Sequence, residues 1–119
     1  MSENDTRAAA ARTVRHVEGT TVLTLHGEID VLTAIPVARH LDDLTSAPHP
    51  DLVVDLRPVS FIDCSGLAVL CRTRNRVRAR HGRLRLVSAS NCFLRMLQAT
   101  GLGEVFEIHP HLPLGAPGA

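Results

Sequence analysis

The sequence predicts an α/β domain in which an N-terminal β-hairpin is followed by βαβαβ units that form a mostly parallel sheet covered by helices. Two β-rich runs flank Glu18-Gly19 near the start of the chain, as in a hairpin. Further on, short apolar runs alternate with apolar stripes at the helical period. A strand, a helix and another strand in succession favour right-handed crossovers and parallel pairing.

The size and composition indicate one globular domain. The chain has 119 residues, of which 45% are hydrophobic and 21% charged. No apolar run approaches the roughly 20 residues of a membrane span, and the polar start does not resemble a secretory signal, so we expect a cytoplasmic protein. The formal net charge of +1 gives no general attraction to nucleic acid or membranes.

The first half of the chain is expected to hold a leader, the hairpin and one helix. Residues 1–12 lack a strand pattern and are predicted to be a disordered leader. Strands over Thr13–Glu18 and Thr20–His26 form the hairpin. Proline fits only the first turn of a helix, so Pro36 places the start of the helix near Thr33. The apolar face of this helix comprises Ala34, Val37, Ala38, Leu41 and Leu44.

The second half continues the alternation of strands and helices. The run Leu52–Leu56 is almost continuously apolar, as buried parallel strands are. A helix from near Ser65 to about Arg80 ends at Gly82, and a strand at 84–87 follows. A third helix is capped by Ser88 or Ser90 and closed by Gly101, before a short strand at 105–108. The domain therefore spans 13–108, and the Pro, Gly and His residues of 109–119 predict a disordered tail.

The stretch from Phe61 to Leu67 joins an apolar strand to the second helix. Asp63 and Ser65 are N-cap residue types, which accept hydrogen bonds from the free amides of a first helical turn. Gly66 has no Cβ, so a partner can approach the backbone there. Ser65 would lie at the positive end of a helix dipole, where a phosphate is tolerated. On local chemistry alone, a purely structural capping role is the other interpretation.

A second segment, Gly27-Glu28-Ile29-Asp30, also follows a strand and precedes a helix. The carboxyl ends of parallel strands gather at one edge of a sheet. We therefore expect this turn and the Asp63–Gly66 turn to lie side by side and to form one docking surface.

Two motifs resemble those of a known family. The string Val59-Ser60-Phe61-Ile62-Asp63-Cys64-Ser65-Gly66-Leu67 resembles the phosphorylation-site motif of bacterial anti-sigma factor antagonists, the family that defines the STAS domain. The string Leu25-His26-Gly27-Glu28-Ile29-Asp30 resembles the family's Gly-Glu-hydrophobic-Asp motif. The order of elements also agrees with the family from about Thr13 to about Ile108. In that family the serine before the glycine accepts the phosphate, and here it is Ser65.

The resemblance implies a non-enzymatic regulator of transcription that works by partner switching. The unmodified protein would bind an anti-sigma factor that is also a serine kinase, which releases a sigma factor. Phosphorylation of Ser65 from ATP would switch the protein off, and a serine phosphatase would reverse the modification. The implied partner-binding residues are Gly27, Glu28, Ile29, Asp30, Asp63, Cys64, Gly66 and Leu67. No cofactor, metal, direct nucleic-acid contact or membrane contact is implied, and the oligomeric state stays open between a monomer and a weak dimer.

Two other functional classes stay open. The chain would share its fold with STAS binding modules of transporters, lipid-trafficking complexes or stress-sensing assemblies, which need not be phosphorylated. A small hydrolase using Ser65 or Cys64 is the enzyme alternative. It lacks the GxSxG elbow, because Asp63 and Leu67 occupy the glycine positions.

Cysteine and arginine need separate interpretations. The three cysteines match no paired CxxC spacing, so we expect reduced thiols. Cys64 stands where the family usually has a small hydroxyl residue, and we expect it to be a small filler, with redox sensing as an alternative.

All 13 basic Lys or Arg positions are arginine, which excludes a catalytic lysine. We expect the arginines of the second helix, at 72–80, to form a solvated basic face, with nucleic-acid binding or contact with an acidic partner as alternatives.

Overall fold

The structure, a computed structural model, describes residues 11–113. Within them one sheet has the strand order β1-β2-β3-β5-β6, and β4 pairs with β2 off this path. β1 and β2 pair antiparallel, and the other pairings of described strands are parallel. The prediction of an α/β domain with a mostly parallel sheet is therefore confirmed. The strands are β1 Ala11–Val17, β2 Thr20–Ile29, β3 Asp51–Asp55, β4 Val59–Ile62, β5 Arg83–Val87 and β6 Glu107–His109; the helices are α2 Val31–Leu44, α3 Cys64–Ala79 and α4 Asn91–Ala99.

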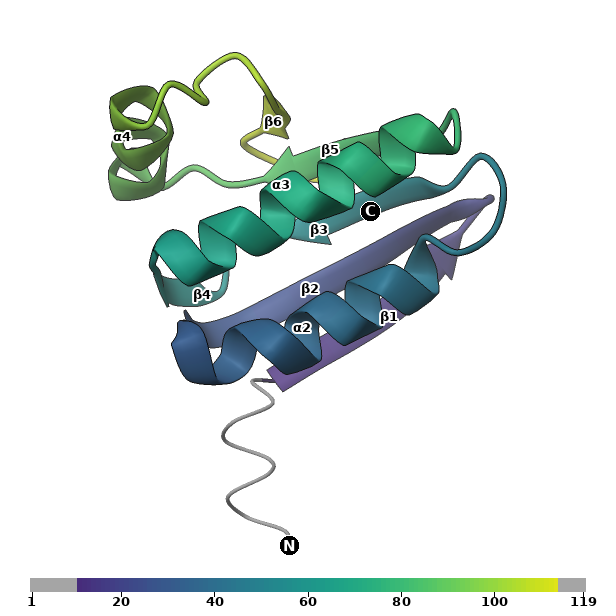
Figure 1. Ribbon diagram of the computed structural model, residues 1–119, viewed down its shortest axis with the longest axis horizontal. Coiled ribbons are helices and arrows are strands. Elements are labelled where there is room, and N and C mark those ends of the chain that lie inside the picture. Colours follow the sequence, from purple (N-terminus) through teal and green to yellow (C-terminus); the bar gives the residue numbers. More distant parts are fainter. Residues whose placement is uncertain (1–10, 114–119) are drawn as a thin grey trace, which may run out of the picture.

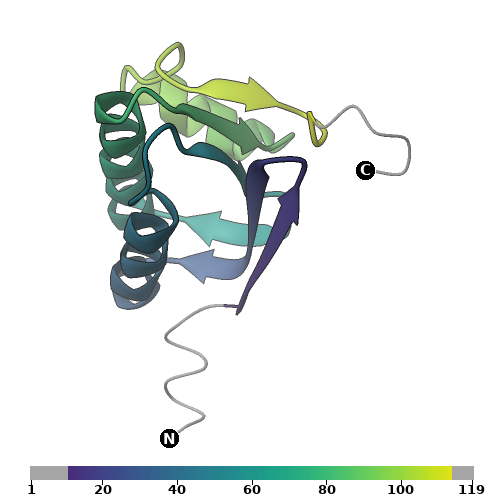
Figure 2. The same ribbon diagram turned by 90° about the vertical axis from the view of Figure 1, so that its right-hand side faces the viewer.

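The helices α2 and α3 lie side by side on one face of the sheet (Figures 1 and 2). The main core fills the space between these helices and the sheet, and α4 adds Phe93 and Leu97 to it. On the opposite face, Val22, Val53 and Val87 form a small apolar centre against which Leu112 packs. No helix within residues 11–113 has the length and apolarity needed to cross a membrane.

The predicted hairpin is present, and its turn has the expected geometry. Glu18 and Gly19 have φ of 50° and 86°, the left-handed values that a two-residue type I′ turn requires. β1 begins at Ala11, so residues 11 and 12 of the predicted leader belong to the sheet. At the other end, β6 includes His109, the first residue of the predicted tail. The expected disorder at 1–10 and 114–119 lies outside the described residues.

β2 pairs with two successive strands along its length. Its residues 21–24 pair with β3, and its residues 27–29 pair with β4, with a register shift between Gly27 and Glu28. Gly27 has φ of 80°, and its N–H donates to the carbonyl of Pro58 at 3.3 Å. The segment from Gly27 to Ile29, which we expected to be a turn, is therefore the bulged end of a strand, because the pairing with β4 extends β2 to Ile29.

α2 begins two residues earlier than predicted, and Pro36 lies in its second turn. Interior proline removes a backbone hydrogen bond and costs about 3 kcal/mol in a typical helix. Here the missing donor would have bonded the carbonyl of Leu32, a residue that is 70% exposed. Asp30 caps the helix and fixes its start at Val31, so the prediction from Pro36 is wrong.

The ends of α3 and α4 follow local turn chemistry. His81, with φ of 59°, takes the left-handed position after α3, where Gly82 was expected. Gly82 has another role, since a Cβ there would lie 2.1 Å from the carbonyl oxygen of Pro50. At α4 the predicted boundaries are confirmed: the Ser90 hydroxyl accepts from the Phe93 N–H at 3.2 Å, and Gly101 follows with φ of 79°.

Candidate docking site around Ser65

The two predicted turns lie next to each other. Ile29 at the end of β2 is in register with Ile62 at the end of β4. The backbone N–H of Asp63 donates to the carbonyl of Ile29 at 3.1 Å, which ties the second turn to the first. Asp30 and Asp63 follow these strands as the N-caps of α2 and α3, and both helices start at the same end of the molecule (Figure 1).

Asp30 holds the first turn in a capping box. Its Oδ1 accepts from the N–H of Leu32 at 3.0 Å and of Thr33 at 3.2 Å. In return, the Thr33 hydroxyl accepts from the Asp30 N–H at 2.9 Å and donates to the carbonyl of Glu28 at 2.9 Å. These bonds fix the Asp30 carboxylate at the helix start, while Glu28 beside it is exposed.

Asp63 holds the second turn and places Ser65 on it. The Asp63 Oδ1 accepts from the N–H of Ser65 at 2.8 Å and of Gly66 at 3.2 Å. Ser65 is the second residue of α3 and is half-buried. Its hydroxyl makes no hydrogen bond with any residue in the range 11–113. The capping role therefore belongs to Asp63, and the Ser65 hydroxyl is left at the positive end of the helix, where a negative charge is stabilised by about 0.3–1 kcal/mol.

Three of the predicted contact residues face the core. A Cβ on Gly66 would lie 2.6 Å from Ile62 Cγ1 and 2.8 Å from Ile29 Cγ2, so its missing side chain serves internal packing and gives a partner no clearance. Leu67 is 5% exposed and Ile29 is 1% exposed. The expectation that the side chain of Leu67 contacts a partner is therefore corrected, because this position of α3 packs in the core between the helix and the sheet.

Four large apolar side chains are exposed around the two turns, and their exposure is not predicted by the sequence pattern. Leu32 is 70% exposed, Val31 68%, Ile35 61% and Phe61 51%. Burying such side chains is favourable by roughly 1.5–3 kcal/mol each, which makes them candidate contacts for a protein partner. We call the docking surface the set formed by Ser65 and the exposed residues Glu28, Val31, Leu32, Ile35, Phe61 and Cys64. Since Cys64 is exposed, the expectation of a filler is wrong.

A profile of the STAS domain matches residues 11–114. This chain belongs to the STAS domain family.

Relatives of this STAS domain are anti-sigma factor antagonists. The anti-sigma-F factor antagonist RsfA of Mycobacterium tuberculosis H37Rv is 33% identical over 105 residues, which cover 86% of this chain and 81% of that protein. The anti-sigma-B factor antagonist of Bacillus subtilis 168 is 33% identical over 95 residues, which cover 80% and 86%. The solved structure of the Bacillus cell fate determinant SpoIIAA in its phosphorylated form has the same fold, with a TM-score of 0.65 and 20% identity over 85% of this chain and 93% of that one.

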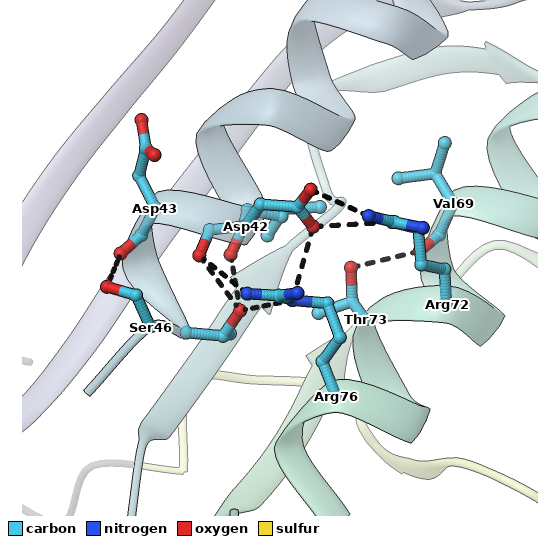
Figure 3. A network of polar contacts seen from close by, with 9 residues as sticks. Asp42, Asp43, Ser46, Val69, Arg72, Thr73 and Arg76 are labelled. Atoms are coloured by element: carbon cyan, nitrogen blue, oxygen red, sulfur yellow. Dashed lines mark hydrogen bonds and ion pairs between the residues drawn. The ribbon is translucent and has the colours of Figure 1, made fainter. Parts of the chain in front are cut away.

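Three of the arginines of α3 in this STAS domain contact other segments of the chain. Arg72 Nη2 and Arg76 Nε lie 2.9 and 3.2 Å from carboxylate oxygens of Asp42 on α2 (Figure 3). The hydrogen bond from Arg72 and the nearby positive charges hold the pKa of Asp42 below its usual value despite some desolvation. Arg76 also donates to the Thr45 hydroxyl at 3.1 Å, and Arg74 donates to the carbonyl of Val105 at 3.0 Å. We call the contacts of Asp42 with Arg72 and Arg76 the clamp. Arg74 and Arg76 are half-buried, so for these two the expectation of a solvated basic face is wrong, whereas Arg72 remains exposed as expected.

Arginines outside α3 are also paired. Arg85 is buried and lies 2.9 Å from a carboxylate oxygen of Asp51. Arg83 lies 2.6 Å from Glu107. Hydrogen bonds lower the pKa of Glu107 to about 2, and the bond from Arg83 contributes more than the bond from His109. These pairings leave fewer free cations for nucleic acid than the sequence suggests.

The histidines take no part in the docking surface. His16, His49 and His81 are exposed. His40 on α2 is half-buried. Its pKa is lowered mainly by burial and secondarily by repulsion from Arg12. In the described part of the chain, no three His, Cys, Asp or Glu side chains gather as metal ligands would.

Proposed function

We propose that this STAS domain is an anti-sigma factor antagonist that switches partners through phosphorylation of Ser65. Unmodified, it binds an anti-sigma factor serine kinase in the cytoplasm and releases a sigma factor. The kinase transfers a phosphoryl group from ATP to the Ser65 hydroxyl, and a serine phosphatase removes it. The domain itself catalyses nothing. The observation that carries this proposal is the hydroxyl of Ser65, which makes no hydrogen bond within residues 11–113 and lies at a helix start, on the sheet edge where the exposed apolar side chains also occur.

The charge of a phosphate accounts for the loss of binding. It adds about −1.5 to −2 charges next to the Asp63 carboxylate, on the sheet edge that also carries Asp30 and Glu28. A partner that covers the exposed apolar side chains must remove water from this anionic group, which is costly without a paired cation. A loss of about 1.4 kcal/mol already weakens binding tenfold.

The fold is expected to survive the modification. The hydroxyl lies at the positive end of α3 and takes no part in the caps, which depend on the Asp63 carboxylate. The likeness to the phosphorylated form of Bacillus SpoIIAA supports this expectation at the level of the fold. The names of the curated relatives support the role of antagonist.

The site of modification is tested by intact mass after incubation with the anti-sigma factor kinase of the source organism and ATP. Wild type should gain one phosphate, and Ser65→Ala should gain none. Ser60→Ala is the matched control, because Ser60 is exposed on the neighbouring strand, and it should be modified like wild type. Equal incorporation into wild type and Ser65→Ala would remove Ser65 from the mechanism.

The effect of the charge is tested with Ser65→Asp and its neutral counterpart Ser65→Asn. Binding of the kinase, measured by calorimetry, should weaken at least about tenfold in Ser65→Asp and much less in Ser65→Asn. The thermal midpoint of both should stay within a few degrees of wild type, as for ordinary surface changes. Unfolding of both variants would point to a structural role for Ser65 instead.

A further inference from the structure

A cavity of about 320 Å³ opens beside the docking surface, between β4 and the start of α4. This volume is at the lower end of the roughly 300–1,000 Å³ typical of small-molecule sites. Its apolar wall comprises Leu56, Val59, Phe61, Ile62, Phe93 and Met96.

The chemistry of the lining favours an uncharged, apolar occupant. Serines and Cys92 complete the wall, and none of the described lining residues carries a formal charge. The Ser88 hydroxyl accepts from the N–H of Ser90 at 3.2 Å, and the Ser90 hydroxyl accepts from the N–H of Phe93 at 3.2 Å. Since these hydroxyls already serve the start of α4, the cavity offers mainly apolar contact.

The cavity is continuous with the docking surface. Phe61 belongs to both, because it lines the cavity and is 51% exposed. Val59 to Ile62 of β4 run along the cavity, and the chain then passes directly into the Asp63 cap and Ser65. A protein that covers Phe61 and Ser65 therefore also reaches the mouth of the cavity.

We propose that this cavity receives an apolar side chain of the anti-sigma factor, an aliphatic or aromatic anchor that inserts between β4 and α4. This inference rests on the proposed function and adds a second subsite to it. Anchors of this kind, held in desolvated pockets, carry most of the binding energy in many protein interfaces. The phosphate at Ser65 then acts beside the anchor and leaves the cavity itself unchanged.

The native cysteines allow a direct test by alkylation with N-ethylmaleimide. Cys92 is exposed at the cavity, Cys64 is exposed on the docking surface, and Cys71 is half-buried on α3. Rates at each thiol are followed by peptide mass, with and without a saturating amount of the purified kinase. We expect Cys64 and Cys92 both to react at least about tenfold more slowly in the complex, with Cys71 unchanged. Slowing at Cys64 alone overturns the cavity subsite and keeps the proposed function, whereas slowing at neither overturns both.

Filling the cavity from two elements gives a second test. Cys92→Phe enters from α4 and Ser60→Phe from β4, and both positions are exposed. Arg95→Phe is the control, since it adds the same ring to an exposed position of α4 outside the cavity. Both filling variants should bind the kinase at least about tenfold more weakly, and the control should bind within about twofold of wild type.

The outcome separates the two proposals. If the filling variants bind like wild type while Ser65→Asp binds weakly, the cavity subsite is overturned alone. If Ser65→Asp also binds like wild type, the proposed switch fails. Thermal midpoints are measured for every variant, and Ser60→Phe remains decisive if Cys92→Phe fails to fold.

Discussion

Replacing Gly66 with alanine would place a methyl group in a contact that is already closed. The new Cβ would lie 2.6 Å from Ile62 Cγ1, 2.8 Å from Ile29 Cγ2 and 3.0 Å from Ile62 Cδ1. Carbon atoms in contact normally lie about 3.5–4.0 Å apart, so the helix start and the strands must separate by about 1 Å. Ile29 and Ile62 are buried and β-branched, and their stiff χ1 angles limit the room they can give.

Two effects of opposite sign set the magnitude for Gly66→Ala. Alanine is favoured over glycine by about 1 kcal/mol inside a helix, and by less in the first turn, where Gly66 lies. Overpacking of a closed core costs about 1–3 kcal/mol. We therefore expect the free energy of unfolding to fall by about 1–2 kcal/mol. In a domain of this size, that change lowers the thermal midpoint by roughly 4–8 °C.

Urea unfolding of wild type, Gly66→Ala, Ile62→Ala and the double variant measures this effect. Ile62→Ala removes the atom at 2.6 Å, so Gly66→Ala should cost little or stabilise in that background. The coupling between the two sites should be about 1–3 kcal/mol. A rise in stability for Gly66→Ala in the wild-type background is the sign that helix propensity alone predicts, and it would refute the packing account.

Three further predictions concern the clamp, the acid range and the docking surface. Asp42→Asn removes the carboxylate shared by Arg72 and Arg76, so the free energy of unfolding should fall by about 1 kcal/mol at low salt and by less at high salt. An unchanged free energy of unfolding at both salt concentrations would contradict the clamp. Glu107 has its pKa lowered from 4.5 to about 2, so its stabilisation is complete above pH 4.5 and is lost as pH falls to about 2. Glu107→Gln should therefore flatten the stability curve between pH 4.5 and 2, and an unchanged slope there speaks against the pairing. Leu32→Ser should weaken kinase binding about tenfold with an unchanged thermal midpoint, and wild-type affinity would remove Leu32 from the contact.

Features decided by neighbouring residues could be predicted from the sequence. The turn at Glu18-Gly19, the Ser90 cap and the closure of α4 by Gly101 each depend on chemistry within a few residues. The order of strands and helices followed from the change between the strand and helical periods. The adjacency of the two docking turns followed from topology, because parallel strands place their carboxyl ends at one edge.

Features decided by distant residues could not be predicted in this way. Asp42 meets Arg72 across 30 positions of sequence, and only the packing of α2 against α3 brings them together. β4 is four residues long with exposed Ser60 and Phe61, so it has no apolar run of its own and depends on β2 for pairing. The exposure of Leu32 was not predicted because the apolar stripe of α2 identifies only the residues that face the core.

The capping of α2 shows a competition between two local signals. Pro36 suggested a later start, while Asp30 and Thr33 satisfy each other's free donors in a capping box. The box decides the start because it satisfies several amides at once, and the carbonyl left by Pro36 lies on the exposed Leu32. Helix starts are therefore better predicted by counting satisfied donors than by the position of proline.

The ten-residue length of β2 separates the hairpin turn from the docking surface by roughly 30 Å. Glu18 and Gly19 are exposed at that remote end. A fluorophore, an epitope or a surface tether attached at Glu18 would thus leave the Ser65 edge facing freely into solution. Glu18 is therefore a suitable attachment point for immobilising the domain while the proposed exchange of partners is measured over time.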